Sequence, residues 1–126
     1  MLFRSALVFA KANEFNQNHM LRFNLITADI MNGTGRYEQA LKYIDSSQRI
    51  HLEQGFPKAT FRWMQIRSKE LVALSGMNQW SKALEVLSSA YSDSKGTLYE
   101  PKNTLDGKLI GLIQIKNNRK IGRAHV

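Results

Sequence analysis

The chain of 126 residues contains no cysteine and only two prolines. The absence of cysteine excludes disulfide bonds, thiolate zinc sites and cysteine nucleophiles. With 43% hydrophobic and 22% charged residues, the composition argues against a disordered or collagen-like chain. No apolar run approaches the roughly 20 residues that a membrane-spanning helix needs. The sequence therefore predicts one folded domain with a continuous core and no membrane span in this segment.

Positive charge is in excess but it is not clustered. The 18 Lys and Arg residues outnumber 10 Asp and Glu, giving a formal net charge of +8. A clustered basic patch would supply affinity for phosphates of nucleic acids. Here the basic residues alternate with acidic ones, as on solvated helix faces. The interspersed residues are Arg22, Arg36, Lys42, Arg49, Lys58, Arg62, Arg67 and Lys69, among Asp29, Glu38, Asp45, Glu53 and Glu70. A nucleic-acid partner is therefore disfavoured.

A nine-residue pattern occurs twice in the chain, at an offset of 43 residues. Residues 33–41 read Gly-Thr-Gly-Arg-Tyr-Glu-Gln-Ala-Leu, and residues 76–84 read Gly-Met-Asn-Gln-Trp-Ser-Lys-Ala-Leu. The glycine would form a turn, the aromatic would be buried between two antiparallel helices, and the small alanine would let their backbones approach closely. The positions that define the repeat are Gly33, Gly35, Tyr37, Ala40 and Leu41, with Gly76, Trp80, Ala83 and Leu84 in the second copy.

These two patterns resemble the central turn of the tetratricopeptide repeat, over about residues 18–116. The offset is longer than the roughly 34 residues of the short form of that repeat. It is closer to long-helix variants of bacterial regulators and eukaryotic scaffold proteins, in which the second helix ends in Gly-x-Pro, as at Gly55–Pro57. The resemblance implies an all-α fold in which antiparallel helix pairs stack as a short right-handed α-solenoid.

Apolar spacing predicts helices over residues 6–15, 20–32, 37–51, 60–75, 79–92 and 105–116. Residues 16–19 are polar and are predicted to separate the first two helices, whereas Phe23 and Ile30 are predicted to widen the inward stripe of the second. Tyr91 is expected on the inward side of the fifth helix. Thr104 is expected to cap the last helix, Leu112 to face inward, and Asn117–Asn118 to end it. A strand over residues 108–115 is the alternative.

The two ends resemble read-through of a sequencing adapter. Residues 121–126 are what ATC GGA AGA GCA CAC GTC encodes, and residues 1–5 match GTG CTC TTC CGA TCT. Such segments are excluded from fold reasoning. The expected organisation is adapter-derived residues 1–5, a repeat domain over residues 6–119, and adapter-derived residues 120–126. Within the domain, residues 6–17 would end a preceding repeat, 18–56 and 57–93 would form two repeats, and 104–119 would begin a truncated one.

Catalytic and metal-binding patterns are not found. The only histidines are His19, His51 and His125, and none has a second ligand at metal spacing. Serine pairs on predicted helices lack the strained turn of a serine nucleophile, and residues 33–35 lack the lysine of a phosphate loop. No carboxylate pair stands out as an acid and a base. We therefore expect no enzyme activity, no metal and no cofactor.

The resemblance implies that a ligand lies along the surface of the first helices of the repeats. The residues that it places there are Arg22, Leu25, Asp29 and Asn32 on one helix and Gln65, Ser68, Val72 and Ser75 on the next. Some relatives clamp a peptide carboxylate with a set of lysine and asparagine side chains. In this chain Leu25 occupies the position of the first lysine, and Asp29 occupies the position of the first asparagine. That ligand is therefore disfavoured.

These observations favour a non-enzymatic module that binds another protein or an extended peptide, as a fragment of a larger protein and without a small-molecule substrate. The alternative is a regulatory or sensory segment of a signalling protein, such as a histidine kinase, a diguanylate cyclase or a transcriptional regulator. A basic nucleic-acid-binding solenoid is a third, less favoured reading. The sequence does not decide the compartment, although a cytoplasmic location is favoured.

Overall fold

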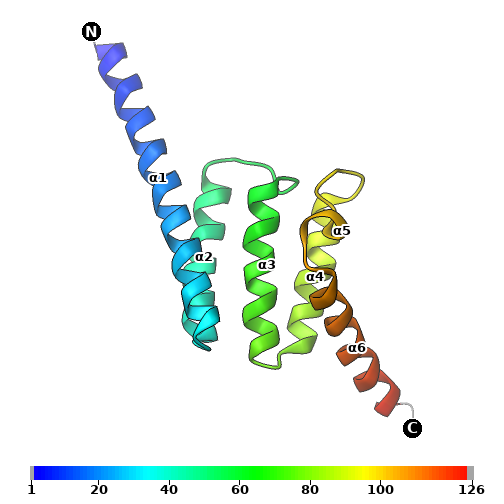
Figure 1. Ribbon diagram of the computed structural model, residues 1–126. Coiled ribbons are helices and arrows are strands. Elements are labelled where there is room, and N and C mark those ends of the chain that lie inside the picture. Colours follow the sequence, from blue (N-terminus) through cyan, green and yellow to red (C-terminus); the bar gives the residue numbers. More distant parts are fainter. Residues whose placement is uncertain (1, 125–126) are drawn as a thin grey trace.

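Six helices account for the secondary structure of the computed structural model, which describes residues 2–124 and the side chains of residues 12, 13 and 15–118 (Figure 1). The helices are α1 Leu2–Gly33, α2 Tyr37–Glu53, α3 Phe61–Gly76, α4 Trp80–Ser94, α5 Pro101–Thr104 and α6 Gly107–Ala124. No strand occurs among the described residues, so the all-α prediction is confirmed and the alternative strand over residues 108–115 is wrong. The predicted adapter-derived ends fall on residues whose side chains, and at 1, 125 and 126 also the backbone, lie outside the description.

The main helices run in alternate directions, and each packs beside its neighbours in the chain (Figure 1). The helices α1 and α2 form one antiparallel pair, and α3 and α4 form the next. The helix α6 then packs against α4, while α1 also contacts α3. The prediction of helices that pack beside their neighbours in the chain is therefore confirmed. No helix in the described part of the chain is both long and apolar enough to span a bilayer.

The turns that close α1 and α3 have the same backbone geometry. After α1, the N–H of Arg36 donates to Met31 O at 2.7 Å, and after α3 the N–H of Gln79 donates to Leu74 O at 2.9 Å. The residue before each donor has a left-handed backbone, with φ of 78° at Gly35 and 58° at Asn78. This is the usual glycine or asparagine C-cap of a helix. The two equivalent hydrogen bonds are therefore separated by 43 residues, the same offset as the sequence pattern.

The core consists of two adjoining clusters of buried side chains. The first joins α1, α2, α3 and Ala90 of α4, and the second joins α3, α4 and α6. Ala40 lies in the first and Ala83 in the second, and both are fully buried. This agrees with their predicted role as close-packing positions. The buried members are Leu21, Leu25, Ala28, Ala40, Ile44, Trp63, Met64, Ile66, Ala73 and Ala90, followed by Leu71, Leu74, Ala83, Leu87, Ile110 and Ile113.

The repeated aromatics Tyr37 and Trp80 are only half-buried. Each is the first residue of its helix. The ring of Tyr37 lies against Gly76 at the end of α3. Trp80 contacts α6, because Lys116 Nζ lies 5.7 Å from its ring centroid and Asn117 Nδ2 donates to Trp80 O at 2.9 Å. The sequence predicted that both rings are buried between the two helices of each repeat, and the structure shows them partly buried.

The contact between Tyr37 and Gly76 predicts a position-specific cost. A Cβ at residue 76 would overlap the ring of Tyr37, whereas a Cβ at Gly33 would meet nothing within 4 Å. We expect Gly76→Ala to lower the free energy of unfolding by about 1 to 2 kcal/mol, in the range of overpacking. Gly33→Ala is the matched control, and in a Tyr37→Ala background Gly76→Ala should be harmless. Urea unfolding of the four variants tests this, and equal stabilities for Gly76→Ala and Gly33→Ala would contradict it.

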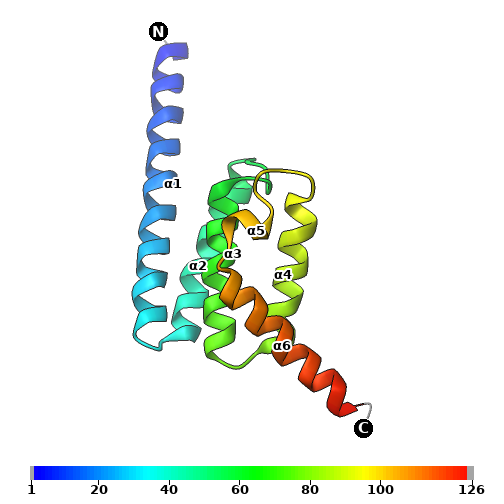
Figure 2. The same cartoon turned by 45° about the vertical axis from the view of Figure 1, so that its right-hand side comes forward.

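The predicted break at residues 16–19 is wrong, because α1 continues through them without interruption. None of these residues is glycine or proline, and asparagine costs a helix only about 0.7 kcal/mol relative to alanine. Asn18 also accepts hydrogen bonds at Oδ1 from Arg62 and Gln54. Asn18 therefore makes a contact between helices rather than part of a turn. Residues 6–17 continue into the helix that holds residues 20–32, which makes α1 extend well past α2 (Figure 2).

One face of α1 is apolar but uncovered by the described residues. Phe15, Phe23, Ile26 and Ile30 are more than half exposed, and they lie opposite the buried Leu21, Asn24 and Ala28. Phe23 and Ile30 therefore do not widen the inward stripe, as predicted, but form a second stripe. Because both stripes have helical spacing, periodicity alone could not assign one of them to the core.

The C-terminal part of the chain also departs from prediction in detail. Asp106, not Thr104, caps α6, since its Oδ1 accepts from the N–H of Lys108 at 2.9 Å. Residues 101–104, which lie outside the predicted helices, form the short helix α5. Leu112 is exposed rather than inward, and so is Tyr91 of α4. The helix α6 does not end at Asn117, whose side chain is instead a contact to α4.

Candidate functional site

The residues predicted to hold a ligand lie on α1 and α3, which pack side by side. Arg22, Asp29, Gln65 and Val72 are exposed. Asn32, Ser68 and Ser75 are half-buried. Leu25 belongs to the first core cluster, so it supports the surface from below and cannot contact a ligand.

Lys69 of α3 connects the two helices at the centre of this surface. Its Nζ lies 2.6 Å from Asp29 Oδ1 and 2.8 Å from Oδ2, and its backbone carbonyl accepts from Asn32 Nδ2 at 3.2 Å. Asn32 and Asp29 are therefore held by contacts within the protein. We refer to Arg22, Asp29, Gln65, Ser68, Lys69 and Val72 as the α1–α3 surface. Sequence reasoning placed five of these residues and missed Lys69, because a salt bridge between helices has no local pattern.

Arg62 lies at one end of the α1–α3 surface and joins three helices. Its Nε donates to His51 Nδ1 at 3.0 Å, its Nη1 to Asn18 Oδ1 at 3.1 Å, and its Nη2 to Gln54 Oε1 at 2.9 Å. The guanidinium also lies 4.7 Å from the centroid of the Phe56 ring. All three acceptors are uncharged. No local pattern indicated this cluster, since its members come from α1, from the C-terminal end of α2 and from α3.

The hydrogen bonds of His51 determine its tautomer. A carbonyl can only accept, so His51 Nε2 carries the proton that it shares with Pro57 O at 2.9 Å. Nδ1 then accepts from Arg62. Burial lowers the pKa of His51, the hydrogen bond to Pro57 opposes this, and the charge of Arg62 lowers the pKa further. Burial also lowers the pKa of Arg62, with a further contribution from the charge of Arg22. His51 is thus a neutral, buried hydrogen-bonding residue.

This arrangement makes stability depend on pH through His51. Its pKa in the folded protein lies below the ordinary value of 6.5, so the unfolded chain takes up a proton first. The contribution of His51 to stability is complete above about pH 6.5, and it is lost as the pH falls from there towards the folded pKa. We expect the free energy of unfolding to decrease through this window, by at most about 1.4 kcal/mol per pH unit for one proton. Urea unfolding of the whole chain at a series of pH values measures it.

A substitution at His51 separates this effect from that of other groups. His51→Gln should reduce the change in the free energy of unfolding between about pH 7 and pH 5, whether or not the substitution itself alters stability. His19→Gln on the exposed side of α1 is the matched control and should leave the slope unchanged. A wild-type slope in His51→Gln would show that another group is responsible.

A second polar cluster joins α3 to α4. Trp63 Nε1 donates to Asp93 Oδ2 at 3.2 Å, and Arg67 Nη1 lies 2.8 Å from Glu70 Oε1. Arg67 Nη2 donates to Ser89 and lies 4.0 Å from Asp93 Oδ2, while the guanidinium stacks on Trp63 at 4.9 Å. Both carboxylates are occupied by these partners. Their arrangement suits packing of two helices, and it leaves neither carboxylate free to act as an acid or a base.

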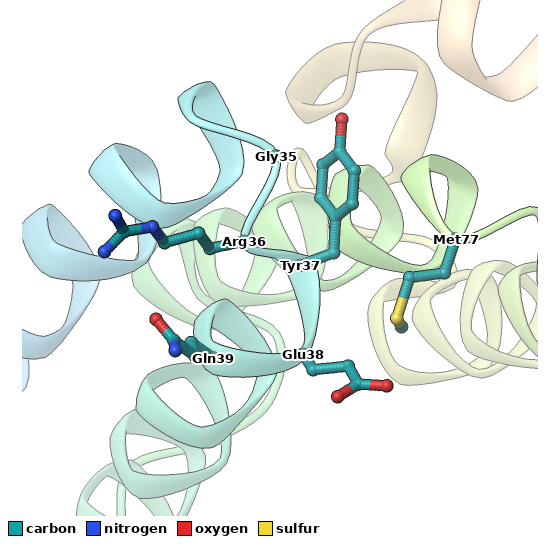
Figure 3. A pocket seen from close by; sticks show the side chains of 6 residues that line it. All are labelled: Gly35, Arg36, Tyr37, Glu38, Gln39 and Met77. Carbon is teal, nitrogen blue, oxygen red and sulfur yellow. The ribbon is translucent and has the colours of Figure 1, made fainter.

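An open hollow of about 290 Å³ lies beside the N-terminus of α2 (Figure 3). It is lined by Gly35, Arg36, Tyr37, Glu38, Gln39 and Met77. The side chains of Arg36, Tyr37 and Met77 point in different directions, and no polar groups converge on one point (Figure 3). The hollow is therefore a product of the two repeated turns. Within the described residues, no group of three histidine or carboxylate side chains could hold a metal ion.

Comparison of the chain with family models, with curated protein sequences and with solved structures found no match.

Proposed function

We propose that the chain is a non-enzymatic interaction module, and that its α1–α3 surface binds an extended peptide segment of a partner protein. The observation that carries this proposal is that α1 and α3 are held together by side-chain contacts, while other side chains on the same surface are exposed. Lys69 fixes α1 to α3 through Asp29 and Asn32, while Gln65 and Val72 beside it are exposed. An amide can donate to and accept from a peptide backbone, and an exposed valine offers apolar contact.

The proposal includes the architecture that the tetratricopeptide resemblance implies, a short right-handed α-solenoid of stacked helix pairs. It is supported by the antiparallel pairs, by Ala40 and Ala83 at equivalent buried positions, and by the two turns with the same hydrogen bonds. In such an array the first helices of successive pairs lie next to each other. The contact between α1 and α3 fits that arrangement.

Binding to a peptide array tests the function. The whole chain, labelled at its N-terminus, is incubated with arrayed peptides of random sequence, and the affinities of the best ligands are measured by fluorescence anisotropy. We expect the double variant Gln65→Ala, Val72→Ser to weaken binding at least roughly tenfold, which corresponds to about 1.4 kcal/mol.

The matched control is Gln114→Ala, Leu112→Ser, which removes an exposed amide and an exposed apolar side chain from α6. This control should bind as the wild type does. Affinities that survive the α3 variant, or an array without any ligand, would remove the proposed function.

A further inference from the structure

Two arginines meet at one end of the α1–α3 surface without a carboxylate between them. Arg62 donates to Asn18 of α1 at 3.1 Å, and Arg22 is exposed one helical turn further along the same face of α1. Among the described residues, no Asp or Glu forms an ion pair with either guanidinium. Burial lowers the pKa of Arg62, and the nearby charge of Arg22 lowers it further by a smaller amount.

The neighbouring basic residues of α3 differ in this respect. Arg67 lies 2.8 Å from Glu70, and Lys69 lies 2.6 Å from Asp29, and both of these basic side chains are half-buried, as is that of Arg62. Arg62 alone among them has only uncharged partners, in Asn18, His51 and Gln54. A partly desolvated cation beside a second cation is unfavourable unless an anion is present.

The guanidinium of Arg62 is also held in a fixed orientation. Three hydrogen bonds, to α1 and to the C-terminal end of α2, and the Phe56 ring restrict it, and the three acceptors do not use all of its N–H groups. A planar guanidinium suits the geometry of a carboxylate, and one that is already ordered loses little entropy on binding. Arg22, which is exposed and has no ion pair, can move to the same ligand.

We propose that Arg22 and Arg62 form a subsite for carboxylate side chains, so that the α1–α3 surface selects acidic peptides. This inference rests on the proposed function and adds the chemical class of the ligand. The ligand's Asp or Glu side chain contacts the two guanidinium groups, while its backbone continues past Gln65 towards Val72. The neutral pair of Lys69 and Asp29 next to the subsite adds no net charge. Positive charge is therefore concentrated at the Arg62 end of the surface.

Fluorescein-labelled peptides, blocked at both ends, test the subsite. In one set a Glu-Glu pair is moved stepwise through a serine and leucine background, and in the second set Gln-Gln replaces it. We expect the best Glu-Glu peptide to bind the whole chain at least about tenfold more tightly than its Gln-Gln counterpart at low salt, as charge-assisted hydrogen bonds contribute. The preference should shrink as salt is raised. Arg22→Gln should abolish most of it, whereas Lys42→Gln on the exposed side of α2 should keep it.

A second variant tests whether a general effect of charge, or a loss of folding, could explain the result. Arg62→Lys keeps the charge but loses the planar fork, so the Glu-Glu preference should fall while thermal unfolding confirms a folded chain. An undiminished preference in Arg22→Gln would overturn the inference. Equal binding of both peptide sets, still sensitive to Gln65→Ala and Val72→Ser, would overturn it and leave the proposed function standing. No binding of either set would overturn both.

Discussion

Replacing Trp63 with alanine is expected to lower the free energy of unfolding by about 3 to 5 kcal/mol, the range for large buried aromatics. Only 2% of Trp63 is exposed, and its ring packs 5.1 Å from His51 and 4.9 Å from the Arg67 guanidinium. Truncation would also leave Asp93 Oδ2 without the indole donor. A loss of this size approaches the whole stability of a small domain. Urea unfolding followed by circular dichroism measures it.

Two other substitutions separate the causes. Trp63→Phe keeps most of the ring contact and removes the donor, so it should cost about 1 to 2 kcal/mol. Trp80→Ala removes a ring of the same size that is only half-buried, so it should cost clearly less than Trp63→Ala. If Trp80→Ala proved as damaging as Trp63→Ala, burial would not be the deciding factor, and the assignment of Trp63 to the core would fail.

Replacing Arg67 with methionine is expected to cost about 3 kcal/mol at neutral pH, because it leaves two carboxylates that are largely out of water. The exposed fractions of the side chains are 15% for Arg67 and 16% for both Glu70 and Asp93. Methionine keeps much of the apolar volume of the arginine stem, so the loss reports mainly on charge. The measurement is again urea unfolding of the whole chain.

The triple variant Arg67→Met, Glu70→Gln, Asp93→Asn removes all three charges together and should regain most of that loss. Arg49→Met is the control for an exposed pair, since Arg49 and Asp45 are 67% and 66% exposed and 3.5 Å apart. Its effect should stay below about 1 kcal/mol. A triple variant as unstable as Arg67→Met alone would mean that the arginine stabilises by packing and not by pairing.

Local features of the fold could be predicted from the sequence because their causes are local. Gly33 and Gly35 end α1, and the copied pattern at Gly76 ends α3 after the predicted interval. The small residues Ala40 and Ala83 are buried as their spacing from the aromatics indicated. In contrast, the break at residues 16–19 was predicted from polarity, and polarity does not end a helix whose side chains bond to a neighbour.

The candidate site was harder to predict, for reasons of tertiary structure. The α1–α3 surface followed from the repeat register, and exposure supports Arg22, Gln65 and Val72. The register cannot show that Leu25 is turned into the core, or that Lys69 crosses to Asp29. The Arg62 cluster depends on three helices meeting at one end, which no single stretch of sequence encodes.

The packing order of the helices also affects the folding rate. Most contacts join helices one or two positions apart in the chain, as α1 with α2 and α3, and α4 with α6. Short separations along the chain mean that little loop-closure entropy is lost before native contacts form. Helical proteins of low contact order fold within microseconds to milliseconds. Stopped-flow or temperature-jump kinetics should therefore place this chain among fast folders, with α1–α2 or α3–α4 able to begin folding before the whole core assembles.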